Sequence, residues 1–244
     1  VFLTVSPIAV VVSRTAGGDS IALFAAYLLL IAWVNGRDSG NGRWFYVFTS
    51  ALALGLTSSP LFYSTLVTLG IAWLGQRFVG PRLFAEDQKW GVETAVLRNG
   101  ILVGAIIFFL INTFFLLNLG GLGAAASLPG DWLSQFGSAA SLTAGLSPLL
   151  AVIRYEIALL VVGLIAIIWA AWRSQTLPMF SVYWLLGMLL LLVVQQGVIS
   201  NAALIILPLY LLIGAFSGAV IGPRIGWHGW LLTEHRGALA GGGN

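Results

Sequence analysis

Long runs of apolar residues, separated by short polar stretches, make up most of this chain. A helix that crosses a bilayer needs about 20 predominantly apolar residues, because each residue adds about 1.5 Å along the helix axis. Eight segments fit such a helix in whole or in part: 1–12, 20–34, 44–57, 60–76, 99–118, 148–172, 178–196 and 202–221. The pattern predicts an all-α fold, a polytopic transmembrane helical bundle with about 7–8 membrane segments.

Two of these segments are short for a membrane span. At about 1.5 Å per residue, Ile21–Val34 and Trp44–Thr57 each reach only about 21 Å. The two segments fit three arrangements: tilted partners, helices of a thin membrane, or one re-entrant pair. The sequence does not choose among the three. Ser59-Pro60 and Ser147-Pro148 indicate helix starts, because serine caps free N–H groups and proline at the first helical position has no donor to lose.

The composition excludes a soluble globular protein. Hydrophobic residues make up 59% of the chain and charged residues only 8%, against a usual charged share of about 25%. The net charge of +3 is too small to indicate a nucleic-acid partner. The lack of cysteine excludes disulfides, thiolate metal sites and a cysteine nucleophile, and the sequence contains no P-loop, dinucleotide-binding or zinc-protease motif.

The distribution of Lys and Arg predicts which side of the membrane each loop faces. If the loop 13–19 lies outside, alternation of the segments leaves only Arg14 and Arg154 on the outer side. Cytoplasmic loops of membrane proteins carry an excess of basic residues. The other basic residues all fall in the expected inner loops and tail: Arg37, Arg43, Arg77, Arg82, Lys89, Arg98, Arg173, Arg224 and Arg236.

This orientation divides the chain into a transmembrane domain and a tail. The transmembrane helical domain is expected at 1–221 and the cytoplasmic tail at 222–244. Within the domain, the Gly-rich segment 119–147 is expected to be an extracytoplasmic loop. Its Trp132 and Phe136 suit the membrane surface, where aromatic side chains are enriched.

Charged residues on the expected outer side are few, and an ionisable group at membrane depth is costly, so each is a candidate functional residue. Arg14 offers a planar donor fork suited to phosphate or carboxylate. Asp19 suits a general base, a group that orients a hydroxyl, or a ligand of a divalent metal ion. Structural roles also fit, because Asp19 precedes an apolar helix as an N-cap does, and Arg14 can extend to lipid headgroups.

Arg154 and Glu156 form a second candidate pair. In a straight helix that starts at Pro148, Arg154 lies about 9 Å below the helix start. Positions two apart on a helix point about 200° apart, so the two side chains are expected to face different neighbours. They fit either a site that faces a cavity or charges that pair across helices, for example with Asp19 or Asp131.

The remaining polar residues give weaker signals. Gln195, Gln196 and Asn201 flank the last outer turn, where amides usually join or cap helices. His228 and His235 have no companion acid or cysteine nearby in the sequence, so no metal site is predicted from them.

Ser6-Pro7, followed by Ser13-Arg14 and Asp19, resembles the "SP…SR…D/E" run of the multi-spanning GT-C glycosyltransferases. These include the protein O-mannosyltransferase and aminoarabinose-transferase types, and the chain is most similar to flippase-activity-associated Agl-type proteins. The resemblance extends from about Ser6 to Leu212 and has three further supporting pieces: Ala51–Leu56, Arg154-Tyr155-Glu156 and Leu207-Pro208-Leu209.

The resemblance implies an all-helical enzyme of the prokaryotic plasma membrane that transfers a sugar from a polyprenyl-phosphate donor to an acceptor on the extracytoplasmic side. It implies that Asp19 is the second acid of the site and that Arg14 or Arg154 holds the lipid phosphate, with Glu156 as a further acid. The usual base of the family belongs to an earlier outer loop, expected upstream of Val1. The implied partners are the donor and membrane lipid, and a divalent metal ion is left open.

Two motifs depart from the family pattern. Thr57-Ser58-Ser59-Pro60 stands where a Lys-Glu pair is usual, and Gln195–Ser200 stands where a charged motif is usual before the last helix. These departures keep two alternatives open. One is a non-catalytic transporter or lipid-linked sugar flipping component, and the other is a structural membrane subunit.

Overall fold

The computed structural model describes residues 18–78, 92–136, 147–173, 176–195 and 202–225. Every regular element in these ranges is a helix, which confirms the predicted all-α fold. Arg14 and the segment 1–12 lie outside the described residues. The described helices are α2 (Asp19–Ser39), α3 (Arg43–Leu56), α4 (Pro60–Phe78), α5 (Thr94–Asn112), α6 (Gly121–Ser134), α8 (Ser147–Tyr155), α9 (Ile157–Arg173), α10 (Thr176–Val194) and α11 (Ala202–Ile225).

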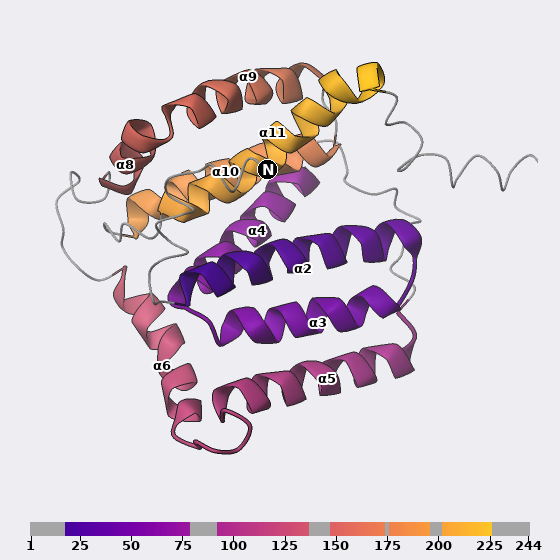
Figure 1. Ribbon diagram of the computed structural model, residues 1–244, viewed down its shortest axis with the longest axis vertical. Coiled ribbons are helices and arrows are strands. Elements are labelled where there is room, and N and C mark those ends of the chain that lie inside the picture. Colours follow the sequence, from indigo (N-terminus) through magenta and orange to yellow (C-terminus); the bar gives the residue numbers. More distant parts are fainter. Residues whose placement is uncertain (1–17, 79–91, 137–146, 174–175, 196–201, 226–244) are drawn as a thin grey trace, which may run out of the picture.

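Most of the helices run back and forth between two ends of one bundle (Figure 1). Helix α3 lies between α2 and α5, α10 packs against both α4 and α11, and α9 packs against α11. At one end α2, α4 and α11 begin, and α6 lies across this end, which we name the α6 end. The opposite end carries, among others, Arg37, Arg43, Arg77, Arg98 and Arg173.

Four helices are long and apolar enough to cross a membrane: α2, α5, α10 and residues Ala202–Val220 of α11. The pair α8 and α9 adds a fifth span if the two are counted together. The chain is therefore an integral membrane protein. Helix α3 has only 14 residues, and α4 has 19 residues but too many polar side chains to meet the same test. The larger number of about 7–8 segments stays a prediction.

The segment expected as one helix at 148–172 is broken. Helices α8 and α9 meet at Glu156 and are bent by 97°. A straight helix would carry two charged side chains about two turns into the apolar layer, which is costly. The bend leaves Arg154 exposed and Glu156 buried. Arg154 itself lies in α8 before the bend, so the distance of about 9 Å from Pro148 along the helix axis applies within α8, and its depth in a membrane stays a prediction.

Two other expectations are corrected at the α6 end. The segment 119–147, expected to be a loop, contains helix α6, whose Ala124, Ala125 and Ala126 favour helix despite the glycines around them. The helix expected at 99–118 ends at Asn112, because the next residues turn into left-handed backbone.

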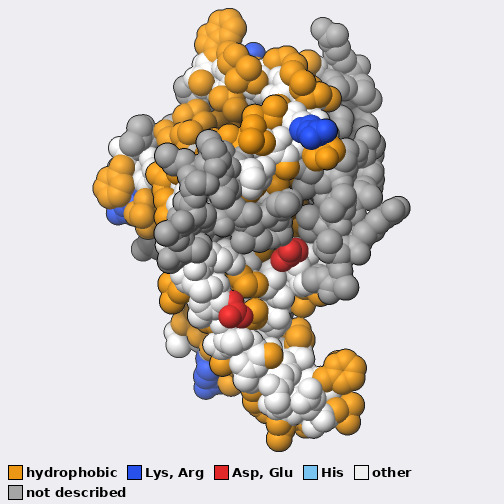
Figure 2. All heavy atoms as spheres, turned by 90° about the vertical axis from the view of Figure 1, so that its left-hand side faces the viewer, with side chains coloured by type: hydrophobic (Ala, Val, Ile, Leu, Met, Phe, Trp, Pro, Cys, Tyr) orange, Lys and Arg blue, Asp and Glu red, His pale blue; other side chains and the backbone are white. Residues whose placement is uncertain are grey.

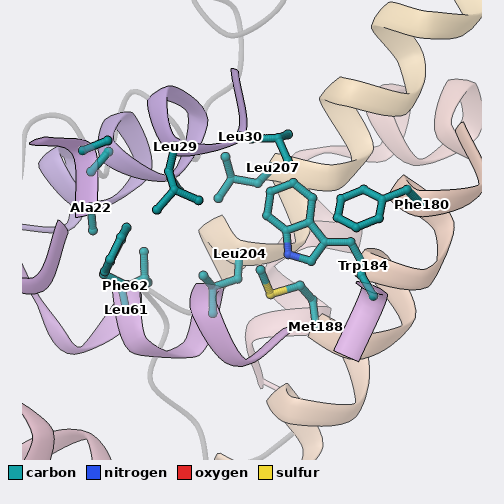
Figure 3. Close-up of a cluster of buried hydrophobic side chains, with 14 residues drawn as sticks. Ala22, Leu29, Leu30, Leu61, Phe62, Phe180, Trp184, Met188, Leu204 and Leu207 are labelled. Atoms are coloured by element: carbon teal, nitrogen blue, oxygen red, sulfur yellow. The ribbon is translucent and has the colours of Figure 1, made fainter. Parts of the chain in front are cut away.

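Two clusters of buried apolar side chains hold the bundle together. The larger cluster joins α2, α3, α4, α10 and α11 (Figure 3). In it Phe62 lies beside Leu61 near the start of α4, and Trp184 lies between Phe180 and Leu207. The second cluster joins α8 and α9 to α10 and α11. In a lipid environment such contacts stabilise through close packing rather than through removal of apolar surface from water.

A row of polar side chains on α4 bonds to α10 along the contact of the two helices. Ser64, Thr68 and Gln76 are spaced by four and eight residues, which places them on one face of α4. Hydrogen bonds connect this row to α10 and the residue after it, and three of them are Ser64 Oγ to Gln195 Oε1 (2.9 Å), Trp184 Nε1 to Thr68 Oγ1 (3.1 Å) and Gln76 Nε2 to the Thr176 carbonyl (2.8 Å). A slip of α10 by one turn would break all three, so the row fixes the register of the pair.

Candidate functional site at the α6 end

Asp19 is the first residue of α2 and is partly buried at the α6 end. Gly18, not Asp19, occupies the N-cap position. The Gly18 backbone packs directly on the carbonyl of Ser58, in the turn between α3 and α4, where an added Cβ would overlap the carbonyl oxygen. Among the described residues, none forms a hydrogen bond or ion pair with the Asp19 carboxylate. The backbone of Asp19 is therefore held at a defined place, and no described residue occupies its carboxylate oxygens.

Arg154 is the second-last residue of α8, and Glu156 lies at the α8–α9 bend. Tyr155 separates the two. The Arg154 side chain is exposed, and its guanidinium lies 5.9 Å from the centroid of the Tyr155 ring. Glu156 is only 5% exposed and takes part in interactions inside the bundle. Its N–H donates to the Val152 carbonyl (2.8 Å) and its carbonyl accepts from Leu160 N–H (2.9 Å). The two charged side chains differ in exposure, and the 200° separation expected on one continuous helix does not apply because the helix breaks at Glu156.

Few charged side chains lie at the α6 end of the described chain. They are Asp19, Asp131, Arg154 and Glu156. Figure 2, which looks onto this end, shows scattered acidic and basic side chains among hydrophobic and uncharged ones. Within the described part of the chain, no ion pair joins Asp19 to Arg154. The structure brings the two to the same end of the bundle without bringing them into contact.

A polar cluster lies where α6 meets the bundle. The Trp132 indole N–H of α6 donates to Ser64 Oγ (2.9 Å), and Ser64 Oγ donates to Gln195 Oε1 (2.9 Å). The Trp132 ring also contacts the Tyr63 and Phe136 rings, with centroids 6.3 Å and 4.9 Å away. Trp132 therefore packs on α4 and Phe136, whereas the sequence pattern had assigned both aromatic residues to the membrane surface.

Two buried polar atoms beside this cluster have no hydrogen-bond partner. Gln195 is fully buried, and its Nε2 donates to no atom of the described residues although its Oε1 accepts from Ser64. Ser59 Oγ is also unpaired and buried, so the predicted cap of α4 is absent although α4 begins at Pro60 as expected. A buried donor without a partner costs about 1–3 kcal/mol.

The sequence pattern pointed to Gln195 only as an amide that joins helices, and it did not point to Ser64 or Trp132. This joining role is confirmed for Gln195 Oε1, which accepts a hydrogen bond from Ser64 of α4. The signal that would have found Ser64 is its four-residue spacing to Thr68, continued at Gln76, in an otherwise apolar helix. No comparable local signal marks Trp132, because its partner is 68 residues away in the chain.

The described ranges contain no group of three or more His, Cys, Asp or Glu side chains arranged to hold a metal ion. Comparison with models of protein families, with curated proteins and with solved structures gives no match to this chain. The function is therefore inferred from the chemistry of the α6 end.

Proposed function

We propose that this membrane protein transfers a sugar from a polyprenyl-phosphate donor to an acceptor at the α6 end, on the extracytoplasmic side of a prokaryotic plasma membrane. The observation that carries the proposal is the α8–α9 bend, which leaves the Arg154 guanidinium exposed at the same end as the unpaired Asp19 carboxylate. A donor of this class needs a cation for its phosphate and a carboxylate near the acceptor hydroxyl.

The proposed orientation rests on the arginines. Arg37, Arg43, Arg77, Arg98 and Arg173 lie at the opposite end, and Arg154 is the one Lys or Arg of the described chain at the α6 end. Basic residues favour the cytoplasmic side of membrane proteins. The opposite end would then face the cytoplasm, together with the C-terminal tail.

In the proposed reaction, Arg154 binds the phosphate of the donor, with Arg14 as a second cation. The bond between the anomeric carbon and the phosphate oxygen breaks, and the lipid phosphate leaves with the electron pair. The acceptor hydroxyl oxygen bonds to the anomeric carbon, and Asp19 accepts its proton. A divalent metal ion bound by Asp19 would instead help to neutralise the phosphate. Glu156, buried at the bend next to this site, is the further acid.

The test uses the purified full chain reconstituted in vesicles with a radiolabelled polyprenyl-phosphate sugar and a hydroxyl acceptor. Asp19→Asn is expected to lower turnover by about 10²-fold or more, the usual contribution of a general base. Arg154→Gln is expected to raise the KM for the donor. Asp38→Asn and Arg173→Gln, at the opposite end, are the matched controls and should leave both constants unchanged.

Two outcomes would overturn the proposal. Full turnover by Asp19→Asn would remove Asp19 from the reaction. Labelled sugar that crosses the bilayer without becoming attached to the acceptor would assign the chain to the flipping of lipid-linked sugars instead.

A further inference from the structure

Helix α6 is attached to the bundle by few contacts. Ala125 is its only buried residue within Gly121–Ser134. Among the hydrogen bonds described for the side chains of α6, that of Trp132 to Ser64 is the one that reaches another helix. Local opening requires least free energy where a segment has few buried contacts. Among the described residues, Trp132 is therefore the main side-chain attachment of α6, and at its first residue the Gly121 backbone packs on the Asn112 carbonyl of α5.

The connection from α5 to α6 has an unusual backbone. Phe114, Phe115 and Leu116 have φ values of 46°, 57° and 71°, in the left-handed region that side chains other than glycine rarely adopt. These residues are 66%, 70% and 61% exposed, so the conformation is held by local hydrogen bonds rather than by tertiary packing; they include Leu116 N–H to Thr113 Oγ1 (3.1 Å) and Asn118 N–H to the Thr113 carbonyl (2.8 Å). Strained backbone of this kind occurs in hinges and ligand-binding segments. The connection is suited to let α6 change its angle.

Beneath Trp132 lie two groups with complementary hydrogen-bonding capacity. If the indole moves away, Ser64 Oγ regains a free acceptor position. The Gln195 Nε2 group already has N–H donors that bond to no described residue, and Gln195 is fully buried. A single hydroxyl group donates one hydrogen bond and accepts another, so it matches this pair. The site carries no charge of its own, which favours a hydroxyl over a phosphate.

We infer that Ser64 and Gln195 form a binding position for a sugar hydroxyl, and that α6 is a movable cover which Trp132 holds closed. The inference deepens the proposed transferase by assigning the sugar part of the substrate to this position. The Tyr63 ring, next to the Trp132 ring in the closed state, offers an apolar face to the sugar ring. The position is near Asp19 in the fold, because α2 starts against the turn that leads into α4.

The first test measures access to Ser64 and uses the absence of cysteine from the chain. In the full chain, Ser64→Cys provides a single thiol for a water-soluble maleimide. Labelling should be slow and should rise about tenfold when Trp132→Ala is added, because the cover then opens more often. Thr68→Cys, one turn deeper and fully buried, should stay unreactive, and the exposed Ser134→Cys should react at once. An unchanged rate with Trp132→Ala would overturn the cover.

The second test measures what binds. Octyl β-glucoside is the sugar probe, and a phosphocholine detergent with the same alkyl chain is its control. In the Trp132→Cys protein, which removes the indole and carries a single thiol while Ser64 and Gln195 stay intact, the glucoside at about twice its Kd should slow labelling about threefold. Gln195→Leu should abolish this protection, and Gln76→Leu, its counterpart at the other end of the α4–α10 contact, should retain it. Equal protection by both detergents would overturn the sugar assignment.

These results do not depend on transfer activity. If Asp19→Asn retains full turnover while the glucoside still protects the thiol, the sugar position stands and the catalytic proposal fails. If Ser64→Cys does not fold, hydrogen exchange of the wild-type chain replaces it. The α6 amides should then exchange at least about tenfold faster than those of α4, and equal exchange would refute a movable cover.

Discussion

Replacing Gly18 by alanine adds a methyl group where α2 begins against the turn between α3 and α4. The new Cβ would overlap the Ser58 carbonyl oxygen and lie 2.6 Å from its carbonyl carbon and 3.2 Å from its Cα. Carbon atoms in contact prefer a separation of about 3.5–4.0 Å. The neighbour is backbone rather than the end of a flexible side chain, so α2 or the turn must shift by about 1 Å.

Overpacking of this kind costs about 1–3 kcal/mol. In a chain of this length each kcal/mol lowers the Tm by about 2–4 °C, so Gly18→Ala should lower the apparent Tm in detergent by about 2–12 °C. The same shift displaces Asp19 and should lower transfer activity in the protein that stays folded.

Gly70→Ala is the matched control for this prediction. Gly70 lies inside α4, where an added Cβ has no neighbour within 4 Å. This variant should keep or slightly raise the Tm, because alanine favours helix over glycine by up to about 1 kcal/mol. Equal Tm values for Gly18→Ala, Gly70→Ala and the wild type would refute the contact between α2 and the turn.

Two further predictions concern packing in the bundle. A double-mutant cycle of Trp184→Phe and Thr68→Val should give a coupling of about 0.6–1.7 kcal/mol in the free energy of unfolding, as found for hydrogen bonds between membrane helices, and zero coupling would contradict the bond. Phe62→Ala should destabilise by about 3–5 kcal/mol in denaturant unfolding, because Phe62 is fully buried, whereas Phe24→Ala, at a side chain 60% exposed, should change stability by less than about 0.5 kcal/mol.

The helical architecture could be predicted from the sequence, because apolar runs specify helices locally. Helices α2, α3, α4, α10 and α11 begin within two residues of the expected positions. The bend at Glu156 could not be predicted in this way. A hydropathy average is taken over a window of many residues. The strongly apolar stretch Ile157–Arg173 therefore hides the cost of placing Arg154 and Glu156 in the apolar layer.

The candidate site could be predicted only in part, for a physical reason. Asp19 and Arg154 are charged residues in an apolar chain, so each is visible by itself. Ser64, Trp132 and Gln195 are uncharged, and their importance arises only from contacts across 68 and 131 residues of sequence. Such contacts depend on which helices become neighbours, and local periodicity carries no information about that choice.

The polar row on α4 also has a consequence for how the protein is made. Its partners on α10 are synthesised 100 to 131 residues later. At about 5–20 residues per second, ribosomes need roughly 5–25 s to supply them. During that interval Ser64, Thr68 and Gln76 have no α10 to bond, and α4 enters the bilayer as a long helix of marginal hydropathy. Its stable integration therefore waits for α10, and a nascent chain that stops before Thr176 should leave α4 open to extraction and degradation by membrane proteases.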